Sequence, residues 1–270
     1  MQTEINQANS EFWNELCGST FAKVLGITGN HPQDLQRFDE AYLQHYPYLL
    51  EHVPVHTMKN KNVLEIGLGY GTLGFQIAKA GANYHGLDIA QGPVNMMRHR
   101  LEAANLKGQD KVIQGNMLQC PLADNSMDYV VSIGCFHHTG DLQRCLDETY
   151  RVLKPKGTAY LMLYNQRSYR QWALWPVKTG KSVLRDWNIY QGSIPIGEDQ
   201  RFAYDQDLAG QAAPETVFAS ITSLRKMLSK YSQVSFTKEN NENVLGVPRR
   251  FLLSSLGKVL GTDIYFSATK

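Results

Sequence analysis

The sequence has no apolar run long enough to cross a membrane, and its first ten residues are polar. A membrane-spanning helix needs about 20 predominantly apolar residues, and a signal peptide needs a basic start followed by an apolar core. We therefore expect a cytoplasmic protein with no integral membrane association. Low-complexity tracts and repeats of solenoid length are also missing, and hydrophobic residues make up 43% of the chain. This composition is typical of a globular protein with one main core.

Cysteine is scarce, and no two cysteines have the C-x-x-C spacing of a redox or zinc motif. The four are Cys17, Cys120, Cys135 and Cys145. Because each lies within an apolar segment, we interpret them as reduced, buried thiols. His52 and His56 have the spacing of two metal ligands on a helix, but Pro54 lies between them and no third ligand is evident. We expect no metal site.

Strand-like and helical segments alternate along the first 165 residues. The expected strands cover 62–66, 83–88, 111–114, 129–133 and 159–163, and the expected helices cover 72–80, 94–104 and 142–153. Five strands separated by helices predict a parallel, doubly wound sheet, which binds ligands beyond the carboxyl ends of its strands. An amphipathic helix at 34–50, with Asp34 as its expected N-cap, precedes this unit.

The glycines Gly67, Gly69 and Gly71 directly follow the first expected strand and open a helix. Glycine permits a tight turn there and lets a ligand approach the backbone N–H groups at the helix N-terminus. Asp88 ends the second strand, 19 residues after Gly69. An acid at that place can accept hydrogen bonds from both hydroxyls of a ribose. Together the two features predict a nucleotide-like ligand.

The loop alone leaves the identity of that ligand open, because Gly69, Gly71 and Gly74 also satisfy the dinucleotide pattern G-x-G-x-x-G. Glu65 lies two residues before the first glycine. A carboxylate there can approach the cationic amino-acid end of S-adenosylmethionine, whereas it sits awkwardly beside the pyrophosphate of NAD. Glu65 therefore favours S-adenosylmethionine, and an NAD(P)-dependent oxidoreductase stays as the alternative.

Six sequence segments, taken together, narrow the choice of ligand further. The segments are Val63–Gly71, Gly86–Ile89, Gly115–Met117, Cys120–Asp128, Ser132–His138 and Arg151–Gly157. In this order and spacing they resemble the class I S-adenosylmethionine-dependent methyltransferases, particularly the ubiquinone/menaquinone methyltransferase-like (type 11-like) branch. The similarity covers about residues 61–165.

The resemblance implies an α/β fold, with a Rossmann-like, doubly wound, mostly parallel seven-stranded sheet whose last strand is antiparallel. Two further expected strands, 233–237 and 263–267, complete that number. The expected organisation is an N-terminal helical cap at 1–60, an S-adenosylmethionine-binding core at 61–164, an inserted lid or substrate-recognition segment at 165–231, and C-terminal strands at 232–270. The insert is longer than a simple crossover, which takes about 30 residues.

The resemblance also implies S-adenosyl-L-methionine as cofactor and S-adenosyl-L-homocysteine as product. The residues expected at the cofactor are Glu65, Gly67, Gly69, Gly71, Asp88, Ile89, Asn116, Met117 and Gly134. The glycines line the methionine moiety, Asp88 holds the ribose, and Asn116 with Met117 contacts the adenine. Asn116 stands where the family usually has Asp; its amide oxygen can still accept a hydrogen bond from the adenine amine but carries no charge.

Two histidines are the candidate catalytic residues. His137 and His138 follow the fourth expected strand at its carboxyl end. Methyl transfer from a sulfonium depends mainly on alignment, and a histidine at this place can also take a proton from a hydroxyl, an amine or an acidic carbon. The alternative is that the two imidazoles only shape the loop.

The expected acceptor contacts are Tyr46, Tyr164, Arg167 and Trp172. Arg167 and Trp172 lie in the insert, which combines basic residues with three of the four tryptophans, a mixture that suits a partly apolar pocket. Helix packing is the alternative role for these aromatics, and contact with a membrane surface is another.

The leading hypothesis is a methyltransferase that acts on an oxygen, nitrogen or carbon atom of a small, partly apolar molecule, such as a secondary metabolite or a quinone-like compound. A non-catalytic cofactor-binding protein is a further alternative. No nucleic-acid partner is expected, because the sequence has no RNA-binding motif and no dense basic stripe. The acceptor, the methylated atom and the oligomeric state are not indicated by the sequence.

Overall fold

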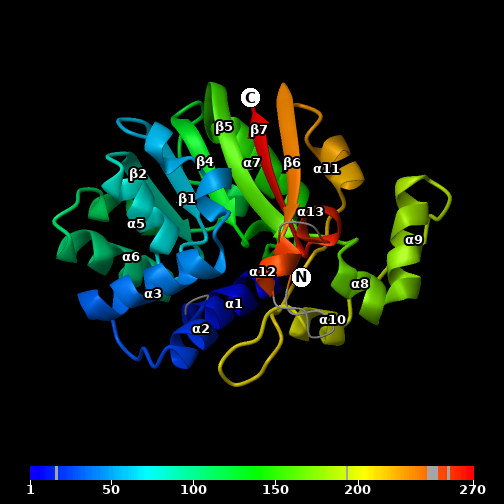
Figure 1. The fold of residues 1–270 in the computed structure, drawn as a ribbon. Coiled ribbons are helices and arrows are strands. Elements are labelled where there is room, and N and C mark those ends of the chain that lie inside the picture. Colours follow the sequence, from blue (N-terminus) through cyan, green and yellow to red (C-terminus); the bar gives the residue numbers. More distant parts are fainter. Residues whose placement is uncertain (16–17, 193, 242–248, 254–255) are drawn as a thin grey trace.

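A seven-stranded sheet runs through the molecule (Figure 1). The computed structural model describes residues 1–15, 18–192, 194–241, 249–253 and 256–270. The strands are β1 (Asn62–Ile66), β2 (Asn83–Asp88), β3 (Val112–Gln114), β4 (Met127–Ile133), β5 (Leu153–Tyr164), β6 (Gln233–Glu239) and β7 (Asp263–Thr269). Their order is β3-β2-β1-β4-β5-β7-β6, with β1 to β5 parallel and β7 antiparallel to both neighbours. The predicted fold class is confirmed.

Helices surround this sheet. The α-helices are α1 (Gln2–Phe12), α2 (Ser19–Val24), α3 (Pro32–His45), α4 (Leu49–His52), α5 (Thr72–Lys79), α6 (Gln91–Ala103), α7 (Leu142–Val152), α8 (Tyr169–Leu174), α9 (Pro176–Asp186), α10 (Glu198–Phe202), α11 (Ile221–Met227), α12 (Arg249–Leu253) and α13 (Leu256–Leu260). The 3₁₀ helices include η1 (Trp13–Glu15), η4 (Met117–Gln119) and η5 (Phe136–His138). Within the described ranges, no helix is long and apolar enough to cross a membrane.

The two faces of the sheet carry separate hydrophobic cores. Val63 of β1 belongs to the core that includes Ile77 of α5 and Met97 of α6, whereas Leu64 belongs to the core that includes Leu146 of α7. Because side chains alternate across a strand, a strand covered on both faces needs apolar residues at successive positions. This requirement explains why β1 is readily predicted from its apolar run.

The helix expected at 34–50 is wrong in two respects. It begins at Pro32 with His31 as its N-cap, because proline is well accommodated in the first helical turn; Asp34 lies inside that turn. It also ends at His45, and a separate helix, α4, follows. Tyr46 has a non-helical backbone (φ −116°, ψ 67°), as expected for a residue that precedes a proline.

The N-terminal helices and part of the insert gather at one edge of the sheet. In Figure 1, α1, α2 and α10 lie along the lower edge, at the carboxyl ends of the parallel strands, whereas α9 projects to the side. Hydrogen bonds join this cap to the core: the Asn9 amide donates to the His138 carbonyl (2.6 Å), and the Ser10 hydroxyl donates to the Ile89 carbonyl (3.1 Å). The expected division of the chain at residues 60, 164 and 231 stays a prediction.

The free thiols follow the expectation where the structure describes them. Cys120 and Cys145 are buried, and Cys135 is half-buried. Burial raises the pKa of the Cys145 thiol to about 12, so it stays protonated near neutral pH. Cys17 lies outside the described residues.

Candidate active site

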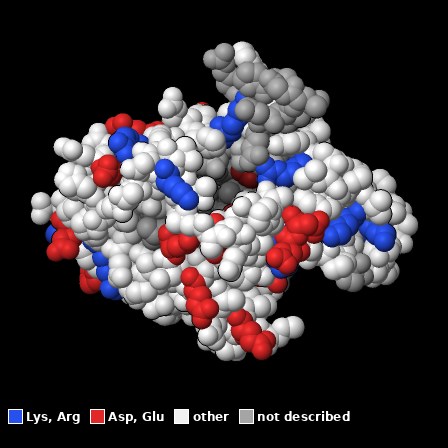
Figure 2. Space-filling model, turned by 90° about the horizontal axis from the view of Figure 1, so that it is seen from below, with Lys and Arg blue, Asp and Glu red and all other residues white. Residues whose placement is uncertain are grey.

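A cavity of about 640 Å³ opens at the carboxyl ends of the parallel strands. Loops after β1, β2, β3 and β4 form its floor, and residues of the N-terminal cap and of the segment 202–206 form its walls. Figure 2 shows the molecule from this side, with acidic and basic side chains interspersed around a central hollow. The position agrees with the rule that doubly wound sheets bind ligands at this edge.

The glycine turn leaves its backbone open to the cavity. Gly67 and Gly71 both have positive φ angles, +80° and +77°, and Gly71 caps the N-terminus of α5. A Cβ atom at Gly67 would lie 2.5 Å from the Cβ of Cys135, so no larger residue fits there. Gly69 and Gly134, two other predicted cofactor residues, line the same cavity.

Asp88 presents a buried carboxylate to the cavity. Its Oδ2 accepts a hydrogen bond from the Leu68 N–H (2.7 Å) and its Oδ1 accepts one from the Ala90 N–H (2.9 Å). Burial raises the pKa of this carboxyl to about 6, although these N–H groups act in the opposite direction. Each carboxylate oxygen has a second lone pair, so Asp88 can accept two further hydrogen bonds from a ligand.

Glu65 is buried beneath the first turn of α5. Its Oε2 accepts a hydrogen bond from the Tyr84 hydroxyl, and burial raises the pKa of the carboxyl to about 8. A Cβ atom on Gly74 would lie 2.2 Å from the same Oε2. The third glycine of the dinucleotide-like pattern is therefore needed for packing against this pair, and its presence does not require a pyrophosphate ligand.

The predicted adenine-side residues line the cavity together. Asn116 Oδ1 accepts a hydrogen bond from the Leu118 N–H (2.9 Å) and caps the short helix η4. Met117 is only 4% exposed, and it borders the cavity with Ile89. This region combines an amide with apolar surface.

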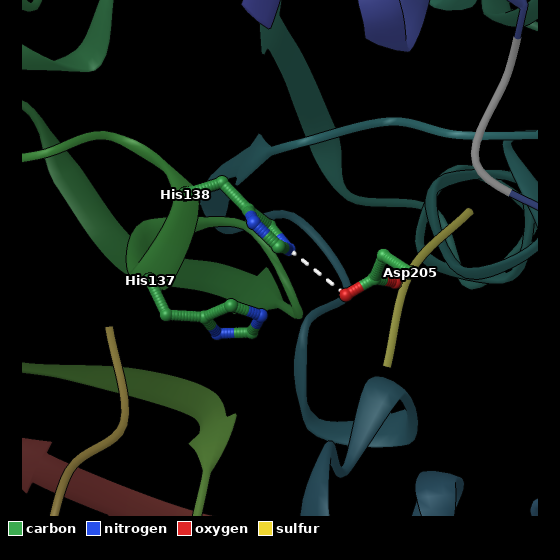
Figure 3. A group of neighbouring side chains, drawn as sticks. All are labelled: His137, His138 and Asp205. Carbon is green, nitrogen blue, oxygen red and sulfur yellow. Dashed lines mark ion pairs between the residues drawn. The ribbon is translucent and has the colours of Figure 1, made fainter. Parts of the chain in front are cut away.

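The two candidate catalytic histidines occupy different environments. His138 lines the cavity, and its Nε2 lies 3.5 Å from Oδ2 of Asp205 (Figure 3). His137 is fully buried, does not line the cavity, and packs against the ring of Tyr164 with 4.0 Å between ring centroids. Burial, together with His138, lowers the pKa of His137 well below its usual value, so this imidazole is neutral at pH 7. Of the two, His138 alone faces the cavity.

The structure brings two of the four predicted acceptor contacts to the cavity and leaves two outside it. Tyr46 and Tyr164 line the wall. Arg167 instead pairs with Asp186, and Trp172 is 40% exposed; neither is part of the cavity lining. The helices of the insert are short, so the sequence does not indicate which of these side chains point toward the cavity.

Two important acids escape prediction from the sequence. Asp205 lies in the insert, and chain folding alone brings it beside His138. Asp39 on α3 accepts two hydrogen bonds from the buried Arg100 (2.8 and 3.0 Å) and one from the Thr72 hydroxyl (2.6 Å), which ties the cap to the start of α5. Its sequence signal is an acid among residues that face the core, one position after Phe38.

Comparison with known proteins finds a match to the part of the chain that contains the cofactor loops. The family model described as "Methyltransferase domain" matches residues 64–161. The chain carries a methyltransferase domain. The predicted resemblance to S-adenosylmethionine-dependent methyltransferases is thereby confirmed, and the family implies S-adenosylmethionine as the cofactor of this domain.

Curated relatives share this domain. A sterol 24-C-methyltransferase from Pneumocystis carinii is 32% identical over 123 residues, which are 45% of this chain and 32% of the relative. A ubiquinone/menaquinone biosynthesis C-methyltransferase from Rickettsia typhi is 34% identical over 104 residues, 36% of this chain and 42% of the relative. The chain thus spans between about a third and two fifths of the length of these relatives.

Solved structures share the fold of the methyltransferase domain. The YcgJ protein from Bacillus subtilis superposes with a TM-score of 0.55 at 16% identity, covering 84% of this chain and 99% of that one. An S-adenosylmethionine-dependent methyltransferase from Methanosarcina mazei gives a TM-score of 0.51 at 18% identity, covering 80% and 96%. At such low identity the likeness concerns the fold alone.

Proposed function

We propose that this protein transfers the methyl group of S-adenosylmethionine to an oxygen, nitrogen or carbon atom of a small, partly apolar acceptor. The observation that supports it is one cavity lined both by the glycine turn with Asp88 and by His138 with Tyr164. A cofactor and an acceptor therefore have room side by side. The names of the sterol and quinone relatives agree with an apolar acceptor.

The residues at the floor fit such a cofactor. The backbone of Gly67, which lines the cavity, would border the methionine moiety, the remaining lone pairs of Asp88 would accept from the ribose hydroxyls, and Asn116 with Met117 would border the adenine. S-adenosylmethionine supplies a methyl group already activated on a sulfonium. Glu65 would influence cofactor binding indirectly, through its hydrogen bond with Tyr84 and its position next to the glycine turn.

His138 and Asp205 would form the polar end of the acceptor pocket. A hydrogen bond between Nδ1 and the Glu215 carbonyl (2.6 Å) orients the His138 ring. Nε2, on the other side of the ring, then faces Asp205. Tyr204 and Phe218 pack near Tyr164 and supply an apolar, aromatic neighbourhood. An acceptor with one polar atom on an apolar body suits this combination.

Calorimetric titration of the purified protein with S-adenosylmethionine, S-adenosylhomocysteine and NADH tests the proposal. Binding of both adenosyl ligands without NADH is expected and would lead to an acceptor screen. Binding of NADH alone would overturn the proposal in favour of an oxidoreductase. Binding of the adenosyl ligands without turnover of any screened acceptor class would favour a non-catalytic cofactor-binding protein.

A further inference from the structure

Two buried histidines, His137 and His138 from η5, and the half-buried Asp205 from the insert converge at the wall of the cavity (Figure 3). One ligand atom from each lies within 4.8 Å of the others. Both nitrogens of His137, Nε2 of His138 and Oδ2 of Asp205 are buried and have no hydrogen-bond partner among the residues that the structure describes. A buried polar atom without a hydrogen-bond partner costs free energy. Four such atoms in one place therefore call for an explanation.

The surrounding hydrogen bonds leave lone pairs facing one another. His138 Nδ1 is 2.6 Å from the Glu215 carbonyl, which can only accept a hydrogen bond, so Nδ1 carries a proton; when the ring is neutral, its lone pair lies on Nε2. Asp205 Oδ1 accepts a hydrogen bond from the Tyr164 hydroxyl (3.0 Å), which leaves Oδ2 toward His138. Two lone-pair atoms 3.5 Å apart attract only if a positive species lies between them.

We propose that His137, His138 and Asp205 form a binding site for a divalent transition-metal ion of the zinc type. Two imidazoles and one carboxylate are the protein ligands of many catalytic zinc sites, which keep further positions open. Ligand atoms around zinc lie about 3.4 Å apart. The 3.5 Å between His138 Nε2 and Asp205 Oδ2 is already close to this value, and all three ligand atoms lie within 4.8 Å of one another. The bonds from Glu215 and Tyr164 orient two of the ligands, as outer-shell partners do in metal sites.

The open side of this site is the cavity. His138 and Asp205 line it, whereas His137 supports them from the buried side. A bound cation would therefore present its remaining coordination positions to the acceptor pocket. Imidazole ligands favour zinc over magnesium, which prefers oxygen.

The test measures metal binding alone. The full chain is dialysed against a chelator, and then titrated by calorimetry with zinc chloride and separately with magnesium chloride. We expect one zinc per chain and no comparable binding of magnesium. Asp205→Asn keeps the side-chain shape and the acceptor for Tyr164, and His138→Gln removes the imidazole; each should weaken zinc binding by at least about 100-fold. His56→Ala, which removes an exposed histidine, is the matched control and should bind zinc as the unmodified protein does.

Stoichiometric zinc binding that is lost in both site variants but not in the control supports the site. Absence of one-to-one binding, or equal binding in Asp205→Asn and the unmodified protein, would overturn it, and the gap would then hold a shared proton. Thermal melts identify a variant that fails to fold; if His138→Gln fails, Asp205→Asn decides alone. Because no methyl donor is present, the outcome is independent of the proposed methyl transfer.

Discussion

Gly74 and Glu65 occupy neighbouring space so closely that a Cβ atom on the glycine would lie 2.2 Å from the carboxylate oxygen Oε2. The same atom would lie 2.4 Å from the Tyr84 hydroxyl. The pair is buried, so neither partner can move into solvent. A helix and two strands therefore meet at a position where only glycine fits.

Gly74→Ala should destabilise the protein by about 1–3 kcal/mol, the usual cost of overpacking a core. Gly180 in α9 has no atom within 4 Å of its virtual Cβ. Gly180→Ala is the matched control and should stabilise by about 0.5–1 kcal/mol, because alanine is the better helix former. Urea unfolding of both variants measures the difference. Equal effects would contradict the packing account.

Asp88→Ala should weaken binding of S-adenosylmethionine by about 10–100-fold. The loss corresponds to hydrogen bonds to a charged group, worth about 1.5–3 kcal/mol. Glu102→Ala, an exposed acid on α6, should leave the affinity unchanged. Calorimetry measures both. Unaltered affinity in Asp88→Ala would remove this residue from the ribose site.

The stability of the ligand-free protein should fall as pH rises from about 4.5 to 8 because of Glu65. Its pKa is raised from 4.5 to about 8, so over this window the folded state keeps a proton that the unfolded state releases. Asp88 and Asp263, with pKa values near 6 and 7, act in the same direction. Glu65→Gln should therefore flatten part of the slope, as measured by urea unfolding between pH 5 and 8. An identical slope in the variant would contradict the burial of an ionisable Glu65.

Asp39→Ala should cost about 3–5 kcal/mol of stability, because it leaves the buried Arg100 without its carboxylate. Asp34→Ala on the same helix is the control. Asp34 forms an exposed pair with Arg37 (3.6 Å), and such pairs contribute at most about 1 kcal/mol. Thermal unfolding of both variants compares them, and a small loss in Asp39→Ala would show that the cap docks independently of this network.

His138→Ala should lower turnover of an acceptor found by screening by about 100-fold while changing the affinity for S-adenosylmethionine much less. His138 lines the cavity at the end expected for the acceptor, so its effect belongs to the reaction. His56→Ala is again the control. Parallel losses in turnover and cofactor affinity would instead show that His138 only shapes the loop, which Asn9 contacts through the His138 carbonyl.

The strands and the cofactor loop follow from local sequence, whereas the acceptor side does not. β1 and β2 have the predicted bounds, since buried parallel strands require apolar runs and glycine marks the turn between strand and helix. The helix at 34–50 fails at Tyr46 because the effect of the following proline outweighs the apolar periodicity. Arg167 and Asp205 lie outside the helices of the insert, and Trp172 lies in the short helix α8, so tertiary contacts decide which of these side chains reach the cavity.

The position of β7 between β5 and β6 bears on how the chain assembles. β6 precedes β7 in the chain, yet in the described sheet it is hydrogen-bonded to β7 alone. During synthesis β6 therefore emerges before the strand that can hold it, and β5 keeps an unpaired edge until β7 arrives. An exposed strand edge is a template for pairing with other chains. Until β7 is made, the growing chain therefore exposes such an edge on β5.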